Sequence, residues 1–329
     1  MCGDQRLIIN FLPLNATERR QFEEAAGDAA QVFAGDPAQR GSMGWHADLG
    51  SLPADIKGRA TAVIGNIPPE QCHELPRLDW LQTWSAGVDK YLAPGVLPDA
   101  SDITNASGAY GQTVSEHMFA MLWAIAKNLP LYGRNQAAHD WHDEGRALSP
   151  ADMTVLVIGT GDIGSHFARL CKVVGATTIG VRRDPSRPAE GIDRMIGFDE
   201  LDETLPHVDA VAMSVPSTPA THHLLDARRF ALLKPGVIVL NAGRGDAIDP
   251  DALLAALHEN ALAGAGLDVT EPEPLPADHP LWDEPRCLIT PHVAGGNHLA
   301  ATEDRIIAIA FDNVRRYAAG QPLRNLVRR

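Results

Sequence analysis

Short apolar runs alternate with amphipathic stretches along the first third of the chain. The runs RLIINFL and TAVIGNI, at residues 6–12 and 61–67, follow this rhythm, and so do the runs at 80–84 and 102–106. The stretch ATERRQFEEAAGDAA after the first run has a composition compatible with a helix. Parallel strands joined by helices produce such an alternation. We therefore expect a first, small α/β unit here.

The same pattern restarts in the middle of the chain. Residues 153–158 form an almost uninterrupted apolar run, which is typical of a strand buried on both faces of a parallel sheet. Five more candidate strands, separated by helix-compatible stretches such as 251–260, lie at 177–181, 210–215, 237–241, 263–268 and 287–290. Six strands in this order predict a second α/β unit with a doubly wound sheet.

Two long helical patterns flank the second unit. The first covers residues 112–129, and we expect it to end before Pro130, because proline inside a helix removes a hydrogen bond. The second covers residues 299–319 near the end of the printed sequence.

Composition and charge narrow the class of protein. The 329 residues are 45% hydrophobic and 21% charged, which indicates a folded globular chain, and this length favours two domains. The net charge of -14 disfavours binding to nucleic acid or to an anionic membrane surface, because both require concentrated positive charge. The most apolar helical stretch, 118–126, is shorter than the roughly 20 residues that cross a bilayer.

The cysteines and the first residues of the chain bear on metals and compartment. Cys2, Cys72, Cys171 and Cys287 form no CxxC pair, so we expect neither a structural zinc site nor a disulfide framework, and no metal. The opening MCGDQR is not basic, and the apolar run after it is interrupted by Asn10 and Pro13. We expect a reducing, cytoplasmic location.

Residues 159–164 read GTGDIG, directly after a strand and before a helical pattern. In such a turn Gly159 permits the sharp bend, Gly161 lets a pyrophosphate approach the backbone, and Gly164 lets helix and strand pack closely. Asp162 and Ile163 open the helix, whose N-terminus attracts the anion. The turn predicts a dinucleotide site, and a glycine-rich turn without a ligand is the alternative.

Arg182 and Arg183 stand at the end of the next strand, where NAD-binding units place an acidic residue for the ribose hydroxyls. Guanidinium groups make forked, charge-assisted hydrogen bonds to phosphate. We therefore expect NADP to be preferred over NAD, the 2′-phosphate lying against these arginines. Two alternatives stay open: the arginines are solvated, or Asp184 accepts the ribose hydroxyls.

Three charged residues follow three different strands of the second unit. They are Arg244, Glu273 and His292, and ligands of open α/β sheets lie beyond these strand ends. Together they offer a cation for an anionic substrate, a carboxylate, and an imidazole that exchanges a proton near neutral pH. This set suits hydride transfer to a ketone: the histidine supplies the proton, the glutamate orients it, and the arginine holds a neighbouring carboxylate. Taken singly, each residue has an ordinary surface or turn role as its alternative.

At this point the chain resembles the D-isomer-specific 2-hydroxyacid dehydrogenases. The likeness is carried by the glycine turn 159–164 and by LLKPGVIVLNAGRGDAID, AGAGLDVTEPEPLP and LITPHVAGG, at 232–249, 263–276 and 288–296. The resemblance implies that Arg244, Glu273 and His292 are catalytic. It further implies reduction of a small 2-oxo acid, such as glyoxylate or hydroxypyruvate, to the D-2-hydroxy acid, and a homodimer.

The resemblance also implies contacts around the cofactor and the substrate. Asp268 matches a residue that contacts the nicotinamide amide, and backbone amides of a substrate loop would hold the substrate carboxylate. The loop residues are Ala86, Gly87 and Val88, and those on the adenosine side are Val215, Pro216 and Thr218.

In this family the nucleotide-binding Rossmann domain is inserted into a smaller, flavodoxin-like substrate domain. The corresponding boundaries here are 1–107 with 299–329 for the substrate domain and 108–298 for the nucleotide domain. Two other functions stay open: a nucleotide-sensing binding protein like the co-repressor relatives, and a formate- or phosphonate-type dehydrogenase.

Overall fold

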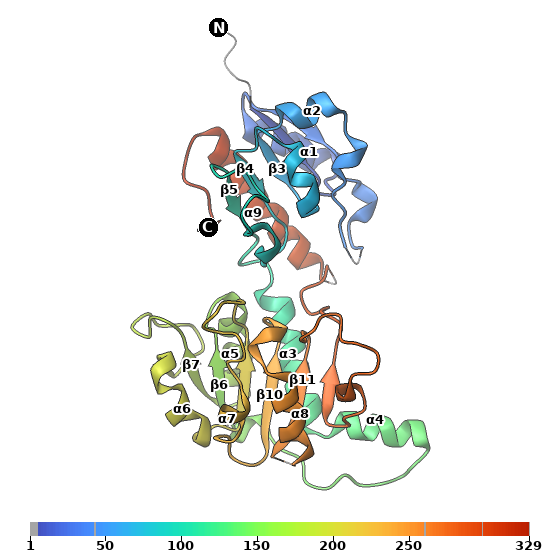
Figure 1. Cartoon of the computed structure of the whole chain (residues 1–329), viewed down its shortest axis with the longest axis vertical. Coiled ribbons are helices and arrows are strands. Elements are labelled where there is room, and N and C mark those ends of the chain that lie inside the picture. The colour runs from blue at the N-terminus through green and yellow to red at the C-terminus, as the bar shows by residue number, and fades with distance from the viewer. Residues whose placement is uncertain (1–5, 43, 260, 298, 329) are drawn as a thin grey trace. The chain divides into compact units, whose positions relative to one another are not determined.

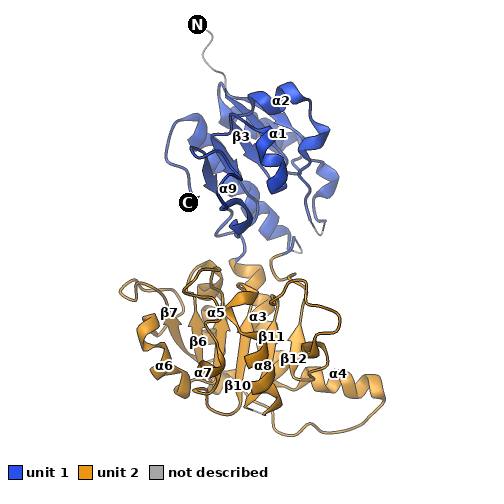
Figure 2. Ribbon diagram, in the orientation of Figure 1, with its two compact units in different colours: residues 1–110, 296–329 blue, residues 111–295 orange. Residues whose placement is uncertain are grey.

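The computed structural model describes residues 6–42, 44–259, 261–297 and 299–328. Cys2, Asn260 and Arg329 lie outside the described residues. The chain forms two compact units, Met1–Tyr110 with Gly296–Arg329, and Gly111–Gly295 (Figure 2). The division lies three residues from the expected boundaries at both junctions, and at the first it coincides with the start of a helix at Gly111.

The first unit contains a six-stranded sheet. Its order is β13-β5-β4-β3-β1-β2, and the five strands β1 to β5 are parallel, in the flavodoxin-like order. The last strand, β13, runs antiparallel to β5. The strands are β1 (Leu7–Asn10), β2 (Ala30–Phe33), β3 (Ala62–Ile64), β4 (Trp80–Gln82), β5 (Asp102–Thr104) and β13 (Leu326–Val327). The sequence pattern missed β2, whose residues AQVF are partly exposed and include the polar Gln31, and it missed β13, which has only two residues.

Among the described residues of the first unit, the α-helices are α1 (Ala16–Ala26), α2 (Ala54–Arg59) and α9 (Ala300–Ala318). Asn15 and Glu18 form a capping box that starts α1. Helix α9 packs on β4, since the ring of Tyr317 lies 5.1 Å from that of Trp80. The C-terminal segment therefore completes the first unit (Figure 1).

The second unit contains a seven-stranded, fully parallel sheet in the order β12-β11-β10-β9-β6-β7-β8. This is the doubly wound Rossmann order with one strand added, and the direction of winding reverses between β6 and β9. The strands are β6 (Thr154–Ile158), β7 (Thr177–Val181), β8 (Arg194–Ile196), β9 (Ala210–Met213), β10 (Val237–Asn241), β11 (Leu262–Leu267) and β12 (Cys287–Ile289). We expected six strands in this sheet; the strand that was not predicted is β8, whose three residues pair with β7 at the edge of the sheet.

Helices cover both faces of this sheet. Helices α3 and α5 pack against each other on one face, and α8 lies on the other face with α7 beside it (Figure 1). Their bounds, together with those of α4 and α6, are α3 (Gly111–Ala126), α4 (Leu129–Ala138), α5 (Asp162–Val173), α6 (Leu201–Thr204), α7 (Ala227–Phe230) and α8 (Pro250–His258).

The helix expected over 112–129 is shorter than predicted. It ends at Ala126, and Asn128 adopts a left-handed conformation with φ of 56°. Pro130 then lies in the first turn of α4, where its missing N–H would have no helical partner in any case. Proline therefore marks the start of a second helix and not the end of the first. None of the described helices is long and apolar enough to cross a membrane.

Candidate active site

The glycine turn lies between β6 and α5. Gly159 has φ of 94°, and an added Cβ would lie 2.7 Å from the carbonyl oxygen of Ser214. A Cβ on Gly164 would overlap the carbonyl oxygen of Gly159, so helix and strand approach closely only because this residue is glycine. At Gly161, which caps α5, a Cβ would meet no atom within 4 Å. Open space thus faces the N-terminus of α5.

This turn fits a dinucleotide pyrophosphate. The twelve-residue helix α5 directs its first N–H groups toward the space beside Gly161. The hydroxyl of Thr160 is buried and has no hydrogen-bond partner among the described residues. Asp162 and Ile163 are half-buried in the first turn of the helix. The Oδ1 atom of Asp162 lies 3.4 Å from Nδ1 of His166, one helical turn further along.

At the end of β7, the two arginines stand at the surface. Arg182 is half-buried and its guanidinium donates to the carbonyl oxygen of Arg187 at 3.3 Å, while Arg183 is exposed. Asp184 accepts a hydrogen bond from the Ser186 hydroxyl at 2.6 Å, and this bond lowers the pKa of the carboxyl. The Asp184 carboxylate is thus hydrogen-bonded within its own turn. The groups that this strand end offers to a ligand are the guanidinium groups of Arg182 and Arg183.

The loop after β9 carries the residues expected on the adenosine side. Val215 is buried, whereas Pro216 and Thr218 are exposed. Thr221, which the sequence reasoning missed, holds the loop: its hydroxyl donates to the carbonyl oxygen of Pro216 at 2.6 Å and accepts from the backbone N–H of Thr218 at 2.9 Å. A threonine in a proline-containing turn is the only sequence signal for this role.

Arg244 follows β10 on a tightly held turn. The buried Asn241 accepts from the Gly243 N–H at 3.0 Å and donates to the Arg244 carbonyl oxygen at 2.8 Å. A Cβ on Gly243 would lie 2.7 Å from the Val215 nitrogen, and one on Gly245 would overlap the Thr270 carbonyl. The backbone that carries Arg244 is therefore fixed between the segments that follow β9 and β11.

Glu273 and His292 are in direct contact. The Nδ1 atom of His292 lies 2.6 Å from Oε1 of Glu273, although these residues follow different strands, β11 and β12. Both side chains are partly exposed, His292 to 49% and Glu273 to 41%. With Nδ1 engaged by the carboxylate, Nε2 is the ring atom that remains for proton exchange.

Asp268 holds the loop that carries His292. Its side chain is buried, and its carboxylate accepts hydrogen bonds from the Thr290 hydroxyl at 2.6 Å, the Val293 N–H at 2.9 Å and the Ala294 N–H at 3.1 Å. The backbone N–H of His292 also donates to the Asp268 carbonyl oxygen at 2.8 Å. The left-handed backbone of His292, with φ of 53°, is thus braced on both sides by one residue.

His117, on α3, extends this network and was missed by the sequence reasoning. Its Nε2 atom lies 3.0 Å from the Thr290 hydroxyl and 3.8 Å from Oδ1 of Asp268. Since Thr290 donates to Asp268, its oxygen accepts from His117. The sequence signal for this role is a histidine directly before the apolar run 118–126 of the helix.

The expected substrate loop belongs to the first unit. The carbonyl oxygen of Ala86 accepts from the Asn105 side chain at 2.8 Å, and that of Gly87 accepts from the Ser85 hydroxyl at 2.7 Å. Val88 is buried and precedes a short 3-10 helix, Asp89–Tyr91. The loop is thus held in one conformation by its own unit.

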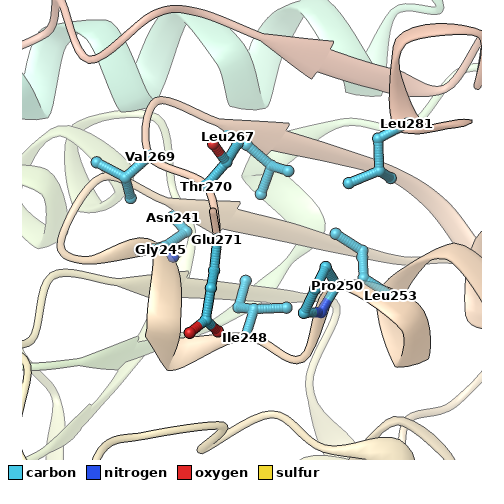
Figure 3. Close-up of a pocket in the computed structure, with 10 residues that line it drawn as sticks. All are labelled: Asn241, Gly245, Ile248, Pro250, Leu253, Leu267, Val269, Thr270, Glu271 and Leu281. Carbon is cyan, nitrogen blue, oxygen red and sulfur yellow. The ribbon is translucent and has the colours of Figure 1, made fainter. Parts of the chain in front are cut away.

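A pocket lies in the second unit at the ends of β10 and β11, beside α8 (Figure 3). Apolar side chains such as Ile248 and Leu253 line most of it, together with Asn241 and Glu271. Of the described residues that line it, none is Arg244, Glu273 or His292. The pocket thus does not include these three side chains, although Gly245, which follows Arg244, belongs to its lining.

Comparison with known proteins places this arrangement in a family. Residues 119–294, more than half of the chain, match the family model described as D-isomer specific 2-hydroxyacid dehydrogenase, NAD binding domain. The crystal structure of a D-isomer specific 2-hydroxyacid dehydrogenase family protein from Aeromonas salmonicida subsp. salmonicida is 31% identical, with a TM-score of 0.80, and the match covers 98% of this chain and 99% of that one.

Two further relatives carry more specific names. A glyoxylate/hydroxypyruvate reductase B from Yersinia enterocolitica is 28% identical over 80% of this chain and 81% of its own. An NADPH-dependent glyoxylate/hydroxypyruvate reductase from Sinorhizobium meliloti, solved with NADP and sulfate, is 25% identical with a TM-score of 0.77, and covers 98% of both chains. The family match, the two parallel-sheet units and the nucleotide-binding turn agree, and the chain belongs to the D-isomer specific 2-hydroxyacid dehydrogenase family of oxidoreductases.

Proposed function

We propose that the protein reduces a small 2-oxo acid of the glyoxylate and hydroxypyruvate class to the D-2-hydroxy acid, with NADPH as the preferred hydride donor and NADH as a weaker one. The observation that carries this proposal is the 2.6 Å contact between Nδ1 of His292 and the Glu273 carboxylate, on the strand end next to that of Arg244. The names of the Yersinia and Sinorhizobium relatives support the substrate class.

Each of the three residues has a defined chemical task in this reaction. NADPH, when bound, supplies the hydride that adds to the carbonyl carbon. His292 donates the proton from Nε2 to the carbonyl oxygen, so that the ketone becomes an alcohol. Glu273 keeps the ring oriented through its contact with Nδ1, so that Nε2 faces the substrate. Arg244 binds the substrate carboxylate with its forked guanidinium.

Around the cofactor, the preference for NADPH rests on Arg182 and Arg183 at the end of β7. Their guanidinium groups would hold the 2′-phosphate, and Asp184 is already bonded to Ser186. Gly159, Gly161 and Gly164 would receive the pyrophosphate. Asp268 would meet the nicotinamide amide, and Val215, Pro216 and Thr218 would line the adenosine side. On the first unit, the backbone of Ala86, Gly87 and Val88 would hold the substrate carboxylate.

A substrate panel tests the reaction. Purified protein is mixed with NADPH or NADH and with glyoxylate, hydroxypyruvate or other 2-oxo acids, and cofactor oxidation is followed by absorbance. We expect a higher kcat/KM with NADPH, and a D-configured product in a chiral assay of hydroxypyruvate reduction. The proposal fails if a cofactor-binding preparation turns over no 2-oxo acid, or if it oxidises only formate or phosphonate-type anions.

Two variants test the roles of the residues. His292→Ala should lower kcat by about 10²- to 10⁴-fold and leave NADPH binding unchanged. Arg244→Ala should raise KM and lower kcat together, because it removes contacts to both substrate and transition state. Near-normal turnover in either variant contradicts the role assigned to that residue.

We further expect a homodimer that works in the cytoplasm. Light scattering of the purified protein checks the first expectation, and fractionation of cells that express it checks the second.

A further inference from the structure

A second cluster of side chains, all of types that can bind a metal ion, lies close in sequence to the proposed catalytic residue Glu273. One ligand atom from each of His222, His223 and Glu271 lies within 4.8 Å of the other two. The Nε2 atom of His223 is 2.7 Å from Oε2 of Glu271, and that of His222 is 3.8 Å from Oε1. The two imidazoles therefore face the two oxygens of one carboxylate.

The pair of histidines is held in place by the backbone around it. His223 has a left-handed backbone with φ of 45°, and its N–H donates to the carbonyl oxygen of Asp246 at 2.7 Å. Two residues later, Leu225 forms a parallel bridge with Ile248. The two imidazole rings stack with centroids 4.0 Å apart and 24° between their planes. The rings thus lie side by side without depending on a ligand.

Glu271 approaches this pair from the loop after β11. Figure 3 shows its carboxylate beside Ile248, the residue that the bridge joins to the histidine segment. A second carboxylate, that of Asp249, lies 4.0 Å from Nδ1 of His223, on the ring edge opposite Glu271. At this distance the carboxylate forms no hydrogen bond with the ring but adds a second negative charge beside it. The local charge therefore favours a cation.

We propose that His222, His223 and Glu271 bind a divalent transition ion of the zinc class. Two imidazole nitrogens and one carboxylate oxygen are donors that suit Zn²⁺, Co²⁺ or Ni²⁺, whereas Mg²⁺ and Ca²⁺ prefer oxygen ligands alone. Three protein ligands at a partly exposed site leave a position for water. We expected no metal because the cysteines form no CxxC pair. The proposed ligands are histidines and a glutamate, which that argument did not consider.

The site would tie together two loops that are far apart in the sequence. The histidines follow β9, and Glu271 precedes Glu273 by two residues. The metal would thus fix the loop that carries the proposed partner of His292. The alternative is an ordinary ion pair between His223 and Glu271, and the experiment below separates the two.

Calorimetric titration of ZnCl₂ into the metal-stripped, full-length protein tests the proposal directly, without measuring activity. We expect one strong site per chain. His222→Gln, which changes the most exposed ligand, should weaken Zn²⁺ binding by about tenfold or more, and so should Glu271→Gln. Circular dichroism of each variant establishes that it is folded.

The matched control is His142→Gln. The Nε2 atom of His142 lies 3.8 Å from Oε1 of Glu144, so this pair copies the His222–Glu271 separation but lies outside the three-residue cluster. This variant should bind Zn²⁺ like the wild type. The proposal is overturned if the wild type binds no Zn²⁺, if both ligand variants bind it unchanged, or if the control weakens binding as much as His222→Gln does.

Co²⁺ provides an independent reading of the ligands. Its visible absorption should show a four- or five-coordinate ion in the wild type, and this spectrum should be lost in His222→Gln and remain in the presence of excess Mg²⁺. A six-coordinate spectrum like that of the free aqueous ion contradicts the site.

Discussion

Replacing Asp268 with asparagine should loosen the loop that carries His292. The carboxylate is buried and accepts three hydrogen bonds, two at Oδ1 and one at Oδ2. In Asp268→Asn the single amide oxygen can keep the Thr290 and Val293 bonds. The amide nitrogen then faces the N–H of Ala294, so that two donors confront each other and one charge-assisted bond is lost.

The size of the effect follows from that count. Removing a charged acceptor and leaving the buried N–H without a partner costs about 1.5–3 kcal/mol in all, so we expect the free energy of unfolding to fall by about 2–3 kcal/mol. For a unit of this size, that corresponds to a decrease in melting temperature of about 4–12 °C. Displacement of His292 within the loop should lower kcat/KM by about 100-fold.

Thermal unfolding by circular dichroism and steady-state reduction of a 2-oxo acid measure the two effects. Asp278→Asn, which removes an exposed carboxylate from the same unit, is the control for the change in charge. If Asp268→Asn melts at the temperature of this control, the carboxylate does not hold the loop. If it melts earlier but keeps full activity, the position of the loop does not set the position of His292.

Three further predictions concern the turn, the acid limit and the thiols. Gly164→Ala should lower the melting temperature, because the added Cβ would overlap the carbonyl oxygen of Gly159. Gly161→Ala should fold normally, since its Cβ meets no atom, but should bind NADPH more weakly. Equal melting temperatures for the two variants would contradict this prediction. The carboxyl of Asp202 accepts hydrogen bonds from Arg228, which has the larger effect, and from Arg229, and these bonds lower its pKa below the unfolded value of about 3.9. The ionised carboxylate therefore stabilises the fold above about pH 3.9, and this stabilisation is lost as the pH falls through the lowered pKa. Denaturant titrations across this range should show a smaller acid loss in Asp202→Asn, and an unchanged loss would rule out the contribution. In a Cys2→Ser variant, a thiol reagent at about pH 8 should react slowly until denaturant is added, since burial raises the pKa of Cys72 to about 11 and those of Cys171 and Cys287 to about 12. Rapid reaction of the native variant would contradict this.

Much of the second unit was predictable because the requirements are local. A buried parallel strand needs a continuous apolar run, as at Thr154–Ile158, and the turn after it needs glycine at Gly159 and Gly164 for backbone reasons alone. Arg244, Glu273 and His292 each follow one of three successive parallel strands, and this order by itself predicted that they lie at the carboxyl ends of those strands. Local signals failed where a residue has two uses, as with Pro130, which begins a helix in place of ending one.

Other features were decided by tertiary structure. β8 begins with the exposed Arg194 and has no apolar run of its own, and it forms because β7 offers hydrogen bonds at the edge of the sheet. The bonds of Asp268 to the loop after β12, and the approach of Glu271 to His222 and His223, join segments whose proximity depends on the sheet order. Side-chain contacts of a few ångströms are set by the packing of whole elements, whereas the sequence by itself determined which elements form and which chemical groups stand at their ends.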